Sequence, residues 1–84
     1  MPADPSAIAA HATTLHNDSG ALAVCAVRLG EIARRLAETT AAPAWLGDVL
    51  HDHVTRCLAA SADLATAAAR VEDHSRAVAP PQAP

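Results

Sequence analysis

Large apolar side chains recur at every seventh residue along most of the chain. The two runs hold Ile8, Leu15, Leu22, Leu29 and Leu36, then Leu50, Cys57, Leu64, Val71 and Val78. A sustained seven-residue spacing keeps one seam of an α-helix turned toward a partner helix. The pattern therefore predicts an all-α protein in which two long helices pack together.

The repeat is interrupted once, at Pro43. Proline removes a backbone donor, and the segment Trp45-Leu46-Gly47, with a conformationally permissive glycine, follows at once. This combination predicts an antiparallel two-helix hairpin with a Trp-Leu-Gly turn. We expect the tryptophan to pack on the end of the apolar seam, against Leu46, Val49 and Leu50.

The predicted boundaries follow from the same signals. Asp4 before Pro5 is a good helix start, because a carboxylate accepts free backbone donors and proline suits the first helical position. Asp48 is the predicted cap of the second helix. We expect a single domain over 1–78, with helices over about 5–39 and 48–78, a turn over 40–47, and a disordered proline-rich tail over 79–84.

Two glycines, Gly20 and Gly30, fall inside the first predicted helix, and each costs on the order of 1 kcal/mol relative to alanine. Either another backbone approaches closely there, or the helix simply tolerates them.

A second, weaker seam is expected three residues after each heptad position. It would hold His11, Asp18, Cys25, Ile32 and Thr39 in the first helix and His53, Ala60, Ala67 and His74 in the second. A seam this polar would hold a two-helix pair only loosely. His11 and His74 would lie at nearly the same height near the open end, where two imidazoles sharing a partly buried seam would form a pH-sensitive pair.

Residues 21–27 are apolar on every side, which predicts burial on every side. Val24 and Val27 lie away from the leucine stripe, so the second helix cannot cover them. We therefore expect two hairpins to form a four-helix bundle, the alternative being a solvent-exposed valine pair. The expected partner interface is Leu22, Val24, Val27, Leu29, Leu50, Cys57 and Leu64.

The two cysteines, Cys25 and Cys57, both fall on the predicted seams. If the chain turns near residue 44, facing residues have numbers that sum to about 87, so the two thiols are offset by roughly 7 Å along the axis. That offset strains a disulfide, whose Cα atoms lie ~4.4–6.8 Å apart. We expect reduced core cysteines, with an intramolecular bridge as the alternative.

Composition narrows the possible partners. The chain has 84 residues and a formal net charge of −3, and its basic residues are thinly spread arginines, which argues against nucleic-acid binding. No stretch is apolar enough to span a membrane, and no conventional signal peptide is recognised. A hairpin of this size buries little surface alone, so assembly with another chain is expected.

No catalytic or cofactor chemistry is indicated. His51, His53 and Cys57 cluster in sequence, but Arg34 and Arg35 are expected opposite them, and cations oppose a metal site. The cysteines sit in apolar surroundings, where thiolates are disfavoured, and no phosphate-binding glycine loop occurs. We expect no enzyme activity, no metal and no cofactor.

Residues 6–78 resemble the WXG proteins of type VII (ESX) secretion systems, in particular their alanine-rich actinobacterial relatives. The resemblance rests on a small hairpin of two heptad-patterned helices with Trp45-Leu46-Gly47 at the break between them. It implies a folded four-helix dimer, often a heterodimer with a neighbouring-gene paralogue. Such dimers are secreted substrates, effectors or carriers of effectors, and the Trp-bearing end is also a recognition tip.

The chain departs from the family in lacking tyrosine, so the export signal Tyr-x-x-x-Asp/Glu is absent. The resemblance then implies a signal-less dimer partner that is cytoplasmic before export and secreted without a Sec signal peptide, with a larger effector and the secretion ATPase as possible further partners. The alternative is a cytoplasmic coiled-coil adaptor or immunity-type partner of a larger protein. A neighbouring Trp-x-Gly hairpin or ESX ATPase gene would favour secretion.

Overall fold

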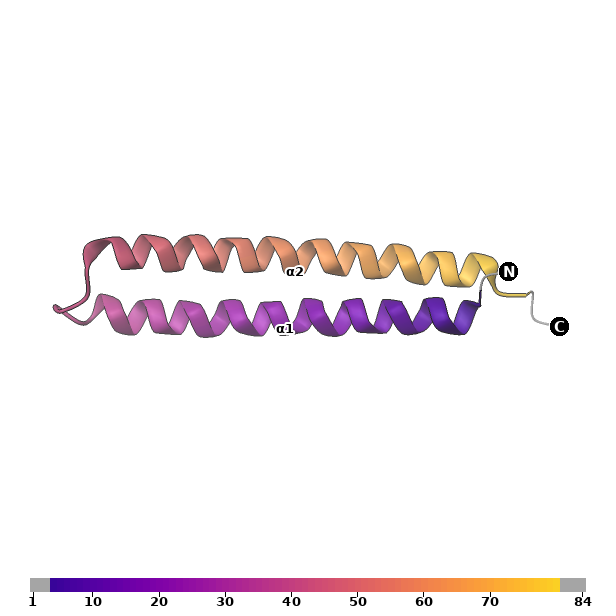
Figure 1. Ribbon diagram of the computed structural model, residues 1–84, viewed down its shortest axis with the longest axis horizontal. Coiled ribbons are helices and arrows are strands. Elements are labelled where there is room, and N and C mark those ends of the chain that lie inside the picture. The colour runs from indigo at the N-terminus through magenta and orange to yellow at the C-terminus, as the bar shows by residue number, and fades with distance from the viewer. Residues whose placement is uncertain (1–3, 81–84) are drawn as a thin grey trace.

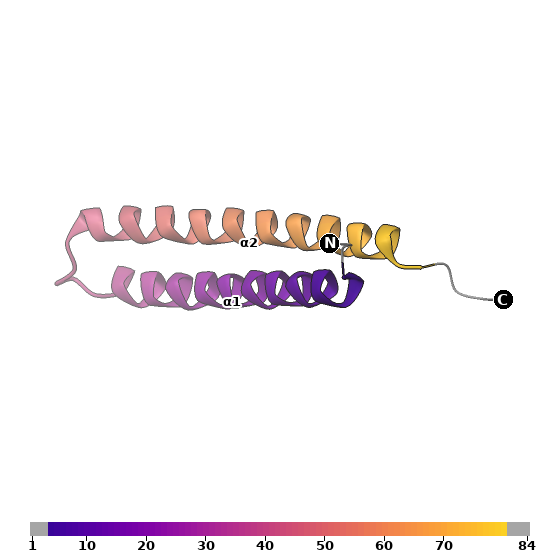
Figure 2. The same cartoon turned by 45° about the vertical axis from the view of Figure 1, so that its right-hand side comes forward.

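The computed structural model describes residues 4–80 and consists of two long antiparallel helices. Helix α1 spans Pro5–Ala37 and helix α2 spans Ala44–Val78, joined by a connector over 38–43. Figures 1 and 2 show the two helices side by side along their whole length, with the connector at one end. The all-α antiparallel hairpin predicted from the heptad spacing is confirmed.

The start of α1 follows the predicted chemistry. The backbone N–H of Ser6 donates to Asp4 Oδ1 at 2.9 Å, and Pro5 occupies the first helical position. The start of α2 does not. Its N-cap is Pro43, whose extended conformation (φ −62°, ψ 143°) leads directly into the helix without a side-chain cap, so the prediction that Asp48 caps α2 is wrong.

The connector is shorter than predicted. Helix α1 ends at Ala37 and α2 begins at Ala44, four residues before the predicted start. The segment Trp45-Leu46-Gly47 consequently forms the first turn of α2 and is not the turn between the helices. A proline immediately before a helix loses nothing by lacking a backbone donor and already has a suitable φ. Of the predicted tail over 79–84, residues 81–84 lie outside the described part of the chain.

The contact between the helices is built from small side chains. The buried residues are spaced by seven along each helix and comprise Ala12, Ser19 and Ala26 on α1 with Ala68 and Ser75 on α2. These positions lie four residues after the heptad residues. No large side chain in the described chain is fully buried. We call this line of small residues the small-residue seam.

Hydrogen bonds across the seam fix the register. Ser19 Oγ donates to Ser61 O at 2.7 Å, and Ser75 Oγ donates to Pro5 O at 2.9 Å. In both pairs the residue numbers sum to 80, not to about 87 as the predicted turn required. The difference follows from the earlier start of α2, which moves the centre of the connector toward the N-terminus.

The predicted second seam does not lie between the helices. His11, Asp18, Cys25 and Ile32 are exposed on α1, as are Thr39 in the connector and His53 and His74 on α2, while Ala60 and Ala67 are half-buried. In a seven-residue repeat, the residue that completes the seam can lie either three or four residues after the heptad residue. In the structure it lies four residues after, where alanine and serine let the two helices approach closely.

Candidate protein-protein interface

One side of the hairpin carries both rows of heptad residues. Ile8, Leu15, Leu22, Leu29 and Leu36 on α1 and Leu50, Cys57, Leu64, Val71 and Val78 on α2 are all half-buried. Each row stands about 40–60° around its helix from the small-residue seam. Because the helices are antiparallel, the same angular offset turns both rows to the same side. We call the surface made by these ten residues the leucine face.

The leucine face is only partly covered because the seam is narrow. Alanine and serine fill the space between the helices, with Ala12 and Ala68 exposed by only 1% and 0%. The larger side chains are therefore displaced to one side, where all ten remain half-buried and leave part of their apolar surface open. Contiguous open apolar surface of this kind marks an interaction site.

The predicted interface residues fall on two different surfaces. Five of them, Leu22, Leu29, Leu50, Cys57 and Leu64, belong to the leucine face. Val24 and Val27 are 51% and 62% exposed, which confirms that α2 does not cover them. However, they lie about 140–200° around α1 from the leucine row. One flat interface cannot contain both sets, so their common membership in an interface is not supported.

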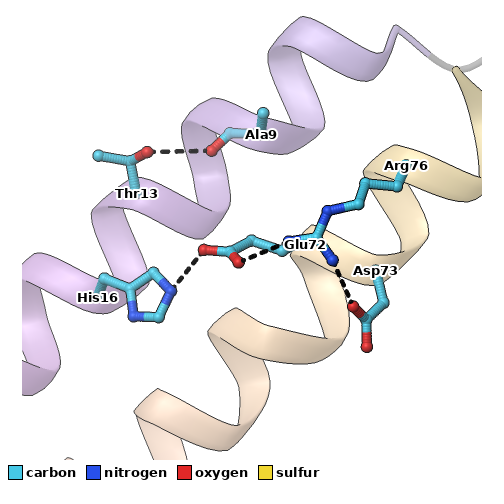
Figure 3. A network of polar contacts seen from close by, with 6 residues as sticks. All are labelled: Ala9, Thr13, His16, Glu72, Asp73 and Arg76. Carbon is cyan, nitrogen blue, oxygen red and sulfur yellow. Dashed lines mark hydrogen bonds and ion pairs between the residues drawn. The ribbon is translucent and has the colours of Figure 1, made fainter.

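The opposite side of the hairpin is polar near its open end (Figure 3). His16 Nε2 lies 2.6 Å from Glu72 Oε1 across the two helices. Arg76 donates to Glu72 Oε2 at 3.4 Å and to Asp73 Oδ1 at 3.0 Å. His16 and Glu72 each follow a buried alanine by four residues, so this network lies on the other side of the seam from the leucine face.

The predicted histidine pair is not formed. His11 and His74 are exposed and border the leucine face, with no hydrogen bond between them in the described structure. The histidine that reaches the other helix is His16, which lies on neither seam predicted from the sequence. A prediction that placed Ala12 and Ala68 between the helices would have identified this contact. His16 follows Ala12, and Glu72 follows Ala68, by four residues, so both side chains lie on the same side of the small-residue seam. The physical basis of the predicted switch, two imidazoles in one partly buried seam, is therefore absent.

Both thiols are free, but their environments differ. Cys25 is exposed on the border of the leucine face, so its prediction as a core residue is wrong. Cys57 is half-buried within the α2 row, where the register places it beside Leu22. Within residues 4–80, no group of three or more histidine, cysteine or acidic residues is arranged to hold a metal ion.

The connector end presents an exposed tryptophan beside a shallow hollow. Trp45 is 63% exposed and does not line the hollow, so the prediction that it plugs the seam is wrong. The hollow has a volume of about 230 Å³, and its lining includes Leu36, Pro43, Leu46 and Gly47. Leu46 is half-buried and takes the position expected for the indole. This end of the molecule therefore combines an exposed indole with a shallow hollow lined mainly by small and apolar residues.

Neither described helix is long and apolar enough to cross a membrane. Comparisons with known proteins find no matching family model, no matching curated protein and no matching solved structure.

Proposed function

We propose that this chain is a non-catalytic binding module that covers its leucine face with a second helical hairpin, and that the resulting four-helix bundle is a substrate or carrier of a type VII secretion system. The observation that carries the proposal is the leucine face itself. Ten heptad residues run along both helices, and all of them are half-buried in the isolated chain. A hairpin with the same apolar pattern is the complementary partner, because its rows match the length and spacing of this face.

The secretion role is supported by the resemblance to WXG proteins and by the exposed end of the molecule. Trp45 is exposed beside the connector, which suits contact with another protein rather than with the hairpin core. The sequence contains no tyrosine, so the proposal assigns the Tyr-x-x-x-Asp/Glu signal to the partner hairpin. The chain is then cytoplasmic before export and is carried out with that partner, through the secretion ATPase and with any effector that the bundle carries.

An export assay tests the secretion role. The tagged chain would be produced in a host with a type VII system, together with a signal-bearing hairpin, with and without a functional secretion ATPase. The proposal predicts that the chain reaches the culture medium only when both ATPase and partner are present, while a cytoplasmic marker stays in the cells. Export without the ATPase, or retention in its presence, would contradict the secretion role.

A second candidate, a cytoplasmic adaptor or immunity-type partner of a larger protein, is favoured by the same leucine face, because any amphipathic helical pair covers it equally well. Retention of the chain in the cell, bound to a larger protein through the leucine face, would support this candidate.

A further inference from the structure

We propose that Cys25 and Cys57 form a disulfide within one chain when the hairpin meets an oxidising disulfide, such as oxidised glutathione. The bond links α1 covalently to α2 near the middle of the hairpin. Both thiols are free in the structure. The inference concerns a single hairpin and does not require a second chain on the leucine face.

The register of the hairpin brings the two thiols to nearly the same height. Hydrogen bonds between the helices fix facing residues at numbers that sum to 80. Cys57 therefore faces position 23, which is two residues, or about 3 Å along the axis, from Cys25. The offset of roughly 7 Å expected from the sequence, which argued against a bridge, is thereby reduced by more than half.

The directions of the two side chains reduce this offset further. In a helix, each Cα–Cβ bond tilts toward the N-terminus. Helix α1 begins at the open end and α2 begins at the connector (Figure 1). The Cys25 side chain consequently tilts toward the open end and the Cys57 side chain toward the connector. Because Cys25 is the one nearer the connector, the two tilts converge, and the Cβ atoms are closer in height than the Cα atoms.

Both cysteines lie on the same side of the small-residue seam as the leucine face. Cys57 stands about 40° around α2 from Ser61, and Cys25 stands about 100° around α1 from Ala26. Small seam residues hold the helix axes about 8 Å apart, the lower end of the usual range, which places the two Cα atoms roughly 7 Å apart. Disulfides join Cα atoms ~4.4–6.8 Å apart, so a slight rotation of α1 brings the pair into range.

The space between the two thiols lies over a small residue. Ala26, the seam residue next to Cys25, is 3% exposed and carries only a methyl group. Leu22 and Leu29 lie three and four residues from Cys25, about one turn away on either side. The bond would therefore cross the seam above Ala26, between the two leucines.

A covalent link at this point suits a hairpin with a thin core. No large side chain in the described chain is fully buried, and small scaffolds commonly need a cross-link or a partner. Because α1 must rotate slightly to close the bond, the resulting strain keeps the bond readily reducible. The link is then open in a reducing cytoplasm and closed outside it. This physiological setting, unlike the chemistry, rests on the proposed function.

Oxidised glutathione supplies the oxidising equivalents. One cysteine sulfur displaces a glutathione molecule and forms a mixed disulfide, and the second cysteine sulfur then displaces the other glutathione. Two protein thiols lose two protons and two electrons in this exchange. One oxidised glutathione becomes two reduced glutathione molecules, so the step is balanced.

Mass spectrometry under non-reducing conditions tests the closure. The parent would be equilibrated in glutathione buffers beside a control that combines Cys25→Ala with Val24→Cys, and circular dichroism would verify that both are helical. Val24 is 51% exposed and only one residue from the position facing Cys57, but it lies on the outer side of α1. The proposal predicts an intramolecular bond in the parent with an effective concentration at least about 10-fold above that of the control. Equal closure of the two chains, or a parent that gives only mixed disulfides and covalent dimers, would overturn the proposal.

Thermal melting provides a second readout. The oxidised parent should melt roughly 5–15 °C above the reduced parent, because the bond restricts the unfolded chain. A reductant should restore the lower melting temperature, and Cys25→Ala and Cys57→Ala should show no such difference. An oxidised parent that melts no higher than the reduced parent would overturn the link between the helices.

The outcome is separable from that of the proposed function. A chain that closes the bond in glutathione buffers but is never exported would support this proposal and contradict the secretion role. An exported chain recovered from the medium with both thiols free would support the secretion role and overturn this proposal.

Discussion

Ser19 and Ser61 exchange hydrogen bonds at the centre of the hairpin. Ser19 Oγ donates to Ser61 O at 2.7 Å, and Ser61 Oγ donates to Ser19 O at 2.8 Å. Their two hydroxyl oxygens are 3.2 Å apart. Such mutual contact between short side chains and backbone requires closely spaced helices, and it fixes their relative height.

Replacing either serine by alanine should lower hairpin stability. The loss of one partly buried hydrogen bond costs about 0.5–1.5 kcal/mol, and the better helix propensity of alanine offsets up to ~0.5 kcal/mol. Relative to Ser6→Ala, an exposed control, we expect Ser19→Ala to lower the free energy of unfolding by about 1 kcal/mol in urea titrations. Equal stability of the two variants would show that the bond contributes nothing.

Enlarging the small-residue seam should push the helices apart. Ala68 is completely buried, whereas its neighbour Ala69 is exposed. Ala68→Leu is expected to reduce the free energy of unfolding by about 1–3 kcal/mol through overpacking. Ala69→Leu, the matched control, should leave it nearly unchanged. Thermal melts followed by circular dichroism would compare the two, and similar melting temperatures would contradict the seam assignment.

The two glycines of α1 should be replaceable. A Cβ atom built on Gly20 or Gly30 meets nothing within 4 Å, so no close approach within the hairpin requires glycine. Gly20→Ala and Gly30→Ala are each expected to stabilise the hairpin by about 0.5–1 kcal/mol. Neither position lies on the leucine face, so dimer mass should not change. Loss of association in either variant would place a partner on the opposite side.

Trp45 should matter little for stability and much for recognition. Because its side chain is 63% exposed, we expect Trp45→Ala to change the free energy of unfolding by no more than about 0.5 kcal/mol. Under the secretion role the same variant should fail to be exported with its partner. Urea titration and the export assay measure the two effects separately. A large stability loss with normal export would assign the tryptophan a structural role instead.

The heptad row of each helix was predicted correctly from the sequence, but the row that completes the contact between the helices was not. Large residues at seven-residue spacing identify a helix face without specifying which neighbouring positions complete the seam. The second seam was predicted three residues after each heptad residue, at positions such as Cys25 and Ile32, whereas the helices pack through the fourth residue, such as Ala26. Close packing of antiparallel helices favoured the smaller ones, which displaced the leucines toward an open face.

The relative height of the two helices and the position of Trp45 were also mispredicted, because the start of the second helix was placed too late. Gly47 was interpreted as part of a turn, although a glycine near the start of a helix is tolerated. Pro43 alone ends the connector, and the helix begins with the next residue. The resulting shift of the register changed which polar groups meet, so that His16 and Glu72 interact across the helices while His11 and His74 do not.

The central claim, that a second hairpin covers the leucine face, is tested most directly by the solution mass of two matched variants. Ile32 borders the leucine face and is 46% exposed, whereas Val27 is 62% exposed on the opposite side. An aspartate at either exposed site should cost the isolated hairpin little, so sedimentation equilibrium reports association itself. Each chain would be measured alone and mixed with a paralogous hairpin. We predict that the parent and the Val27→Asp variant associate in at least one of these two conditions and that the Ile32→Asp variant stays monomeric in both. A parent that stays monomeric in both conditions, or a monomeric Val27→Asp variant beside an associating Ile32→Asp variant, would contradict the account.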